Sequence, residues 1–253
     1  MRNDARLLVT LSSLPVSPSE PCSYLEDRLA RYQAFLWDPE QGRLPGSAYQ
    51  DLMDNRFRRS GRVFYRPVCS GCGSCIPIRI DVESFAPSKS QRRVLRRNQD
   101  VRVRWATPEI TDAKRALYRR YMEGRHGGSD SDPDTLDRFL YDSPTDTIEA
   151  TYWLNGDLIA AGICDVTPQS LSTVYFYFEP GTARRSLGTF SALVEIEAAR
   201  KMGLACYYLG YWVPGCRKME YKAALGPHQL LSGSGWAPAG GSGSGQAPGG
   251  PLR

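Results

Sequence analysis

The chain has 253 residues, of which 41% are hydrophobic and 23% are charged, and its formal net charge is +5. This composition is typical of a globular protein with one large core or two smaller ones. No window holds 18 consecutive apolar residues, which excludes a membrane-spanning helix. The interrupted apolar patch near the N-terminus does not resemble a secretory signal. We therefore expect a cytoplasmic, reducing environment, where clustered cysteines favour metal binding or reactivity over disulfides.

Positive charge is concentrated in two segments. Residues 56–66 contain five arginines and no acidic residue, and residues 89–104 contain seven basic residues against one acidic residue. A solvated protein face usually mixes both signs of charge. The two segments therefore predict an anion-binding surface.

The first hundred residues contain short elements around a cysteine-rich loop, YRPVCSGCGSCIPIRI. Apolar spacing and alternation identify them. In chain order they are a helix at 47–57, a strand at 62–65, a strand at 77–82, and a basic helix that Ser88 or Ser90 caps and that runs to residue 97.

The second part of the chain is more regular. The pair Asn155-Gly156 predicts a tight hairpin, and Gly203 ends a long helix. The predicted elements are a strand at 101–105, helices at 111–125 and 134–141, strands at 148–154, 158–166 and 171–178, a helix at 186–202, a strand at 205–209 and a helix at 218–224. This order resembles the acyltransferase fold of the N-acetyltransferase superfamily, an α+β fold in which a splayed sheet presents backbone groups to an acyl donor.

Composition divides the chain into three parts. Residues 1–100 form a Cys- and Arg-rich N-terminal domain, and residues 101–231 form the N-acetyltransferase-like (GNAT-like) catalytic domain. Residues 232–253 are almost entirely Gly, Ser, Ala and Pro, which bury little apolar surface. We therefore predict a disordered tail from residue 232.

The loop before the long helix, EPGTARRSLGTFS, lies where that fold places its pyrophosphate-binding turn. Free N–H groups at the helix start would face an anion, and Gly188 would allow its close approach. Members of the superfamily that use acyl-CoA carry Gly or Ala where this chain has Phe190, which we expect to crowd a pyrophosphate. The motif therefore disfavours coenzyme A, and an ordinary capped helix start is the alternative.

Five motifs resemble one family. FRRSG, YRPVCSGCGSCIPIRI, FAPSKSQRRVLRRNQD, YFYFEPGTARRSLGTFS and YYLGYWVPGCRKMEYKAALGP are similar to motifs of aminoacyl-tRNA–protein transferases. They look most like the bacterial branch, which moves leucine from leucyl-tRNA onto proteins with N-terminal Asp or Glu. The resemblance implies that the product enters an N-degron degradation pathway.

Three other functions compete with leucyl transfer. They are arginyl transfer to the same acidic N-termini, acyl-CoA-dependent N-acetylation, and a non-enzymatic, metal-stabilised nucleic-acid-binding module built on residues 56–104. Leucine needs an apolar donor pocket and arginine an acidic one, and the chain alone does not separate these two donors.

The resemblance and the charge pattern together suggest binding residues. A carboxylate favours guanidinium or ammonium partners, so Lys89, Arg92 and Arg93 are candidates for binding the acidic acceptor. Arginine and lysine also bind phosphates. The candidates for tRNA binding are Arg96, Arg97, Arg184, Arg185, Gly188 and Lys222. Solvated helix charge is the alternative for each arginine.

The reaction also needs a base close to the acceptor amine. Asp165 lies in an otherwise apolar strand, and a mid-strand acid calls for a reason, so it is the best carboxylate candidate. Anchoring a loop is the alternative. The further catalytic candidates, which lie in family motifs near strand ends, are Tyr177, Tyr211, Lys218 and Tyr221. Aromatic residues there could stack on the terminal adenine of the tRNA or belong to the core.

The cysteines predict a second kind of site. Cys69, Cys72 and Cys75 supply three soft ligands, and Cys22 could be a fourth, for an iron–sulfur cluster or zinc. His126 or His228 could complete a zinc site instead. Eukaryotic relatives carry a further cysteine where this chain has Leu25, which weakens the comparison. A metal-free turn is the alternative, and the transfer chemistry itself requires no cofactor.

Overall fold

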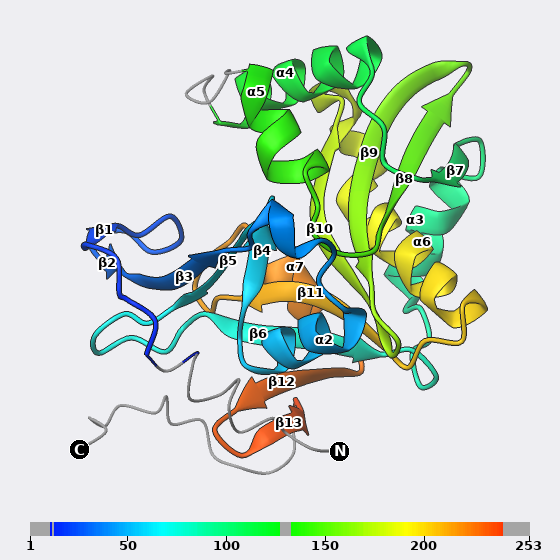
Figure 1. Cartoon of the computed structure of the whole chain (residues 1–253). Coiled ribbons are helices and arrows are strands. Elements are labelled where there is room, and N and C mark those ends of the chain that lie inside the picture. The colour runs from blue at the N-terminus through cyan, green and yellow to red at the C-terminus, as the bar shows by residue number, and fades with distance from the viewer. Residues whose placement is uncertain (1–10, 12, 127–132, 240–253) are drawn as a thin grey trace.

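The structure is a computed structural model in which residues 11, 13–126 and 133–239 are described. Its centre is an eight-stranded sheet with the strand order β13-β12-β6-β11-β10-β9-β8-β7 (Figure 1). A three-stranded sheet in the order β3-β5-β4 and a small β1-β2 pair complete the strands of the described residues. This mixed arrangement confirms the predicted α+β fold class. None of the described helices is long and apolar enough to cross a membrane.

The helices and strands have the following bounds. Up to residue 106 they are β1 (Glu20–Pro21), β2 (Leu29–Ala30), β3 (Tyr32–Leu36), η1 (Pro39–Gln41), α2 (Gly46–Asp54), β4 (Arg58–Ser60), β5 (Val63–Pro67), β6 (Ile76–Asp81), α3 (Lys89–Arg97) and β7 (Arg102–Ala106). The remaining ones are α4 (Asp112–His126), α5 (Pro133–Leu136), η2 (Asp137–Tyr141), β8 (Thr147–Leu154), β9 (Asp157–Val166), β10 (Ser170–Phe178), η3 (Pro180–Arg185), α6 (Leu187–Lys201), β11 (Cys206–Trp212), α7 (Glu220–Ala223), β12 (His228–Ser232) and β13 (Gly235–Pro238).

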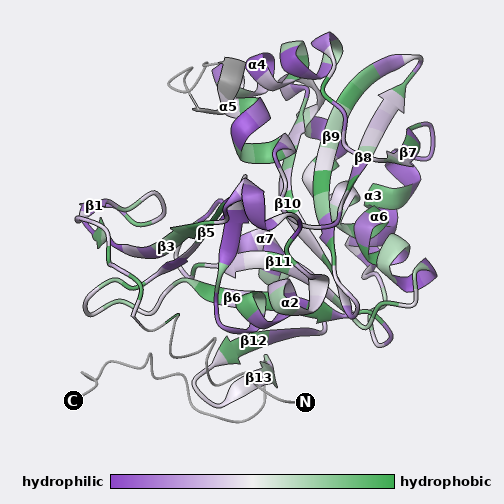
Figure 2. Ribbon diagram, in the orientation of Figure 1, coloured by the Kyte–Doolittle hydropathy of each residue, from purple (hydrophilic) through white to green (hydrophobic). Residues whose placement is uncertain are grey.

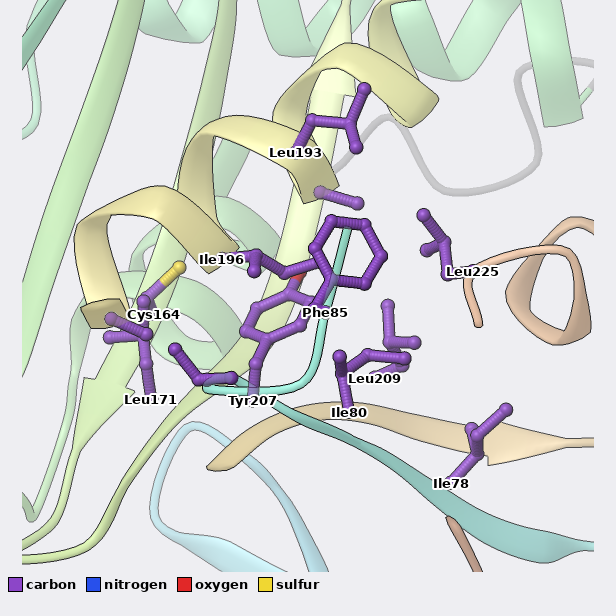
Figure 3. Close-up of a cluster of buried hydrophobic side chains, with 13 residues drawn as sticks. Ile78, Ile80, Phe85, Cys164, Leu171, Leu193, Ile196, Tyr207, Leu209 and Leu225 are labelled. Atoms are coloured by element: carbon purple, nitrogen blue, oxygen red, sulfur yellow. The ribbon is translucent and has the colours of Figure 1, made fainter. Parts of the chain in front are cut away.

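Helices cover both faces of the large sheet. Alternate residues of β9 point to opposite faces, and this strand is largely hydrophobic (Figure 2). On one face Cys164 packs with α6 residues such as Ile196, in a cluster that also holds Leu171 and Tyr207 (Figure 3). On the other face Ile163 packs against α4. The small sheet and α2 also bury an apolar cluster, which includes Tyr208 of β11.

The predicted boundary at residue 100 does not separate two spatial units. β6, from the N-terminal part, lies between β12 and β11 in the large sheet. Ile78 and Ile80 of β6 are fully buried in the same cluster as Leu171 and Tyr207. The cause is that the apolar alternation of β6 completes the core of the C-terminal part. The two parts of the chain therefore share one sheet and one core.

The prediction of a disordered tail from residue 232 is wrong for its first residues. β12 and β13 form an antiparallel hairpin that extends the large sheet. Trp236 is the reason, because its indole N–H donates to Asp54 at 2.7 Å and its ring lies 4.3 Å from the Arg79 guanidinium. The composition of this segment, which is rich in glycine and serine, did not indicate that Trp236 anchors it. Residues 240–253 lie outside the described residues.

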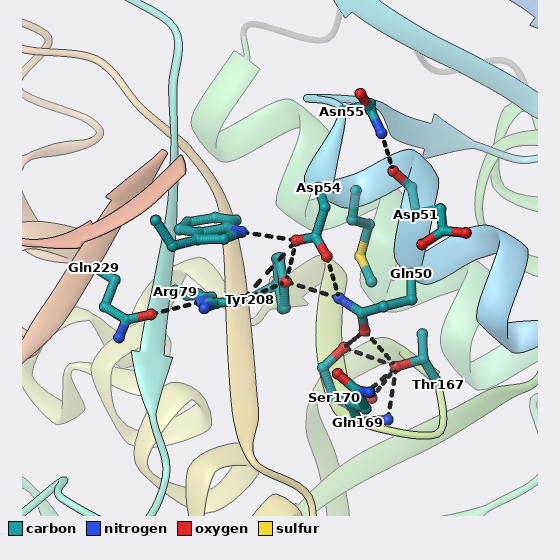
Figure 4. A network of polar contacts seen from close by, with 12 residues as sticks. Gln50, Asp51, Asp54, Asn55, Arg79, Thr167, Gln169, Ser170, Tyr208 and Gln229 are labelled. Atoms are coloured by element: carbon teal, nitrogen blue, oxygen red, sulfur yellow. Dashed lines mark hydrogen bonds and ion pairs between the residues drawn. The ribbon is translucent and has the colours of Figure 1, made fainter. Parts of the chain in front are cut away.

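A polar network joins α2 to the large sheet (Figure 4). The Tyr208 hydroxyl donates to Asp54 at 2.6 Å and accepts from the Gln50 amide at 2.8 Å. Gln50 in turn accepts from Thr167 and Ser170, at the turn between β9 and β10. The small sheet and α2 are thus held to the edge of the large sheet where β10 and β11 begin.

β10 and β11 are parallel neighbours that diverge. They pair only over Ser170–Ser172 of β10 and Cys206–Tyr208 of β11. β10 continues to pair with β9 up to Phe178, and β11 continues to pair with β6 up to Trp212. The facing backbone edges beyond Ser172 and Tyr208 therefore lack ladder partners within the described residues. This divergence matches the predicted splayed sheet of the N-acetyltransferase-like fold.

Candidate active site between diverging strands

Two buried cations lie where β10 and β11 separate. Arg58 reaches the gap from β4 of the small sheet, and its guanidinium donates to the Ser172 hydroxyl of β10 at 3.1 Å. Its guanidinium also lies over the rings of Tyr208 and Tyr211 of β11, at 5.5 and 5.9 Å. Arg58 is only 7% exposed. Its Nη2 has no hydrogen-bond partner among the described residues.

Lys222 of α7 reaches the same gap. It is 8% exposed, and its ammonium group donates to the Tyr211 carbonyl at 2.7 Å. Burial and the charge of Arg58 lower the pKa of Lys222 to about 7. Lys222 is therefore no surface contact for tRNA phosphates, which corrects its predicted role.

Gly210 of β11 lies close to both cations. Its φ of +87° is a conformation that favours glycine. A Cβ atom on Gly210 would lie 3.5 Å from the Lys222 ammonium and 4.0 Å from Nε of Arg58. The side chains of Arg58 and Lys222 therefore both lie close to the backbone of Gly210 in β11.

Asp165, the predicted general base, is the buried partner of Arg59. The side chains of both residues are fully buried, and Arg59 donates to the two carboxylate oxygens at 2.6 and 2.5 Å. Thr147 donates to the same carboxylate at 2.7 Å. In this structure the carboxylate is paired with protein donors and has no exposed surface. The reason for this mid-strand acid is therefore structural, because it fixes the small sheet to β9.

The other predicted catalytic residues divide between two places. Tyr177 is buried against α4, and its hydroxyl lies 3.0 Å from that of Tyr141, far along β10 from its pairing with β11. Tyr211 of β11 lies beside both buried cations, whereas Tyr221 of α7 is 44% exposed. Lys218 is exposed in the segment before α7. The structure thus brings Tyr211 and Lys222 together and leaves Tyr177 in the core.

A second cationic site forms at the start of α6. Arg97, at the end of α3, donates to the Arg184 carbonyl at 2.6 Å. A pocket there is lined by Arg97 and residues 183–186. Ser186 has a left-handed backbone and leads into the N-terminus of α6, and space is open beside Gly188. The predicted anion loop is thereby built from two distant segments. Arg185 differs from its neighbours, because Asp100 accepts from it at 2.8 and 2.9 Å.

Phe190 does not crowd this loop, contrary to the sequence argument. It is 6% exposed and packs inward against the Tyr152 ring, with centroids 5.9 Å apart. The cause is helical geometry, which turns this position of α6 toward the sheet. Phe190 therefore gives no reason to disfavour coenzyme A.

Helix α3 spans the distance between the two cationic sites. Ser88 caps it, as the first of the two predicted candidates, and Gln91 completes the capping box. The Gln91 amide donates to the Ala224 carbonyl at the end of α7. Lys89, Arg92, Arg93 and Arg96 are exposed along the helix. The basic stripe is thus a surface that runs from α7 to η3.

The arginine run at 56–66 does not form an exposed surface, which corrects the prediction of an anion-binding surface for this first charged segment. Arg58 and Arg59 are buried, Arg62 pairs with Asp142 at 2.8 Å, and Arg66 donates to Gln33. Arg58 is not among the functional residues predicted from the sequence, because the segment FRRSG indicated only the family. The available signal is the position of two consecutive arginines within a short strand that follows buried Phe57.

The four cysteines of the predicted metal site lie near one another. Burial first, and then the neighbouring Cys69, Cys22 and Cys72 thiols, raise the pKa of Cys75 to about 12. Yet within the described residues no group of three or more His, Cys, Asp or Glu side chains is arranged to hold a metal ion. The metal site at these cysteines therefore stays a prediction. Metal analysis of anaerobically purified protein tests the prediction directly.

Comparisons with known proteins agree with the resemblance stated above. The sequence profile "Arginine-tRNA-protein transferase, N terminus" matches residues 20–93, and the corresponding C-terminus profile matches residues 113–232. An aspartate/glutamate leucyltransferase of Chromobacterium violaceum is 40% identical over 220 residues, which cover 85% of this chain and 89% of the relative. A Pseudomonas putida protein of the same name is 39% identical over 234 residues, or 90% of this chain and 98% of the relative.

Two solved structures are similar to the chain at low sequence identity. The C-terminal domain of a putative lysylphosphatidylglycerol synthetase from Agrobacterium fabrum has a TM-score of 0.46 at 14% identity, covering 71% of this chain and 54% of that one. FemX has a TM-score of 0.45 at 9% identity, covering 66% and 60%. The sequence relatives, in contrast, match nearly end to end. The chain belongs to the arginine-tRNA-protein transferase family.

Proposed function

We propose that the chain transfers leucine from leucyl-tRNA to the N-terminal amine of proteins that begin with Asp or Glu. The observation that carries this function is the near full-length similarity to relatives named aspartate/glutamate leucyltransferase. The two cationic sites supply the physical support. A transferase of this kind handles two anions, a tRNA and an acidic peptide end, and the fold offers one site for each.

The tRNA donor uses the site at the start of α6. Arg97 and Arg184 face the pocket there, the exposed arginines of α3 extend it, and the α6 N-terminus adds unpaired N–H groups. β10 ends just before η3, so an ester held by this pocket reaches the gap between β10 and β11. Phosphate contacts thereby position the aminoacyl group where the strands diverge.

The chemistry needs little beyond positioning, since an aminoacyl ester is already activated. The acceptor nitrogen attacks the ester carbonyl carbon with its lone pair and forms the new C–N bond. The C–O bond to the terminal ribose then breaks, and the ribose oxygen leaves with the proton that the amine loses. Unpaired N–H groups on the facing edges of β10 and β11 are suited to bind the oxyanion of the intermediate.

The test is a transfer assay with purified protein and labelled leucyl-tRNA. The acceptors are four peptides that differ only in their first residue, which is Asp, Glu, Ala or Lys. We expect transfer to the first two and none to the others. Labelled arginyl-tRNA, run in parallel, tests the alternative donor. Transfer of arginine but not leucine would contradict the donor, and equal transfer to all four peptides would contradict the acceptor.

A further inference from the structure

We propose that Arg58 and Lys222 together bind the side-chain carboxylate of the acceptor's N-terminal Asp or Glu. This inference rests on the proposed function and assigns its specificity to two residues. It differs from the sequence prediction, which gave this role to Lys89, Arg92 and Arg93 on the exposed surface of α3.

Arg58 and Lys222 have no counterion among the described residues. Arg58 Nη2 is buried and has no hydrogen-bond partner in the described part of the chain, although nearly all buried donors in proteins are paired. No carboxylate of the described residues forms an ion pair with Arg58 or Lys222. The nearby acids are engaged elsewhere, since Asp165 binds Arg59 and Asp54 binds Tyr208 and Trp236.

Arg58 and Lys222 also carry charges of the same sign. Both cations lie within 4 Å of one point beside Gly210, and their mutual repulsion and burial both disfavour the folded state. Such a pair persists where it serves a function, because any anion placed between the two groups would relieve the repulsion. A carboxylate fits this place, since guanidinium and ammonium groups are its preferred partners. Gly210 presents no side chain to this place.

The position of the two cations beside the gap between β10 and β11 also suits an acidic N-terminal residue. The N-terminal amine of an Asp or Glu residue is only a few bonds away from its side-chain carboxylate. A carboxylate bound by Arg58, which also contacts Ser172 of β10, therefore places the amine in the gap between β10 and β11. The donor site at η3 follows the C-terminal end of β10, one of the two strands that border this gap. Both cations are covered in this structure, so acceptor entry requires the side chains around them to move.

Paired isosteric peptides test the assignment. The acceptors begin with Asp or Asn, which differ only in charge, and the variants are Arg58→Gln and Lys222→Met. We expect each variant to reduce kcat/KM for the Asp peptide by about 100-fold, mainly through KM, so that the Asp peptide no longer reacts faster than the Asn peptide. Arg43→Gln is the control for a lost positive charge, because Arg43 is exposed and pairs with Asp146 on another part of the surface.

The outcomes separate this inference from the proposed function. If the variants lose transfer to both peptides equally, the two residues serve the donor or the chemistry, and the inference is wrong. If wild-type protein transfers to neither peptide, the proposed function fails first.

Binding gives a readout that needs no donor. An Asp peptide, but not an Asn peptide, should raise the Tm of the wild-type protein and of Arg43→Gln. Neither peptide should raise the Tm of Arg58→Gln or Lys222→Met. A Tm increase by the Asp peptide that survives in both folded variants would overturn the inference.

Discussion

Arg58 and Arg59 are chain neighbours with opposite surroundings. Arg59 is held by the two oxygens of Asp165, whereas Arg58 has Ser172, a methionine sulfur and two aromatic rings. Adjacent residues of a strand point to opposite sides, which explains how Arg58 enters the site and the next residue, Arg59, anchors the sheet. Stability and substrate binding are therefore separable by single substitutions in this strand.

Removing one partner of the Asp165–Arg59 pair leaves a buried charge without compensation. We expect Asp165→Asn and Arg59→Gln each to lower the free energy of unfolding by about 3–5 kcal/mol. Urea unfolding monitored by circular dichroism measures this loss. A stable Asp165→Asn protein that transfers leucine to no peptide would instead return Asp165 to the role of general base.

Lys222→Met should have the opposite effect on stability. The pKa of Lys222 is about 7 in the folded protein, against 10.5 as its ordinary value, because burial and Arg58 disfavour the charged form. Below pH 7 the ammonium is charged in both states and the folded protein bears the full cost. That cost declines as the pH rises from 7 toward 10.5, so this lysine makes stability increase with pH.

We expect the Lys222→Met protein to unfold at a higher urea concentration than the wild type at pH 7, with a smaller difference at pH 9. Urea titrations at the two pH values check this. A lower midpoint for the variant at pH 7 would show that the lysine stabilises the fold.

At the scale of elements, periodic segments could be predicted and their pairing could not. The predicted strand at 158–166 and helix at 186–202 agree with β9 and α6, since apolar periodicity reports a buried face. The positions of β6 beside β11 and of β13 beside β12 depend on contacts between distant residues, which periodicity does not encode. The same limit applies to the site, where the anion loop was predicted locally but the buried state of Arg58 depends on three separate elements.

The cationic surface of α3 and η3 can be tested through salt dependence. We expect Arg97→Gln and Arg184→Gln each to weaken leucyl-tRNA binding several-fold and to reduce the slope of log affinity against log salt concentration by about one. Filter binding over a range of salt concentrations measures both. A matched variant, Arg43→Gln, should leave the slope unchanged, and a similar change in that control would mean that the charge acts without a defined contact.

Trp236 makes the terminal hairpin part of the fold. We expect Trp236→Ala to lower the free energy of unfolding by about 2–3 kcal/mol, through lost packing on Arg79 and Tyr208 and the lost bond to Asp54. Trp236→Phe should lose less, because it retains the ring contacts. Equal losses in the two variants would assign the whole effect to the indole hydrogen bond.

At the scale of the molecule, the segments that the two family profiles match share one sheet and one core. β6 contributes Ile78 and Ile80 to the core formed with α6 and β11. We expect a fragment of residues 101–253 to remain unfolded, because β11 and β12 would each lose a paired edge and the core would lose its β6 side chains. Circular dichroism and solubility of the fragment check this. A soluble fragment with cooperative thermal unfolding would show that the C-terminal part folds alone.

The place of β6 has a consequence for how the protein is made. On the ribosome, β6 emerges long before either of the strands that flank it, so a nascent chain carries an apolar strand with two unpaired edges until β11 and β12 have been synthesised. Such a strand is a target for chaperones and for association with other nascent chains. Yield in a heterologous host should therefore respond to translation speed and chaperone supply more than the finished protein's resistance to heat would suggest.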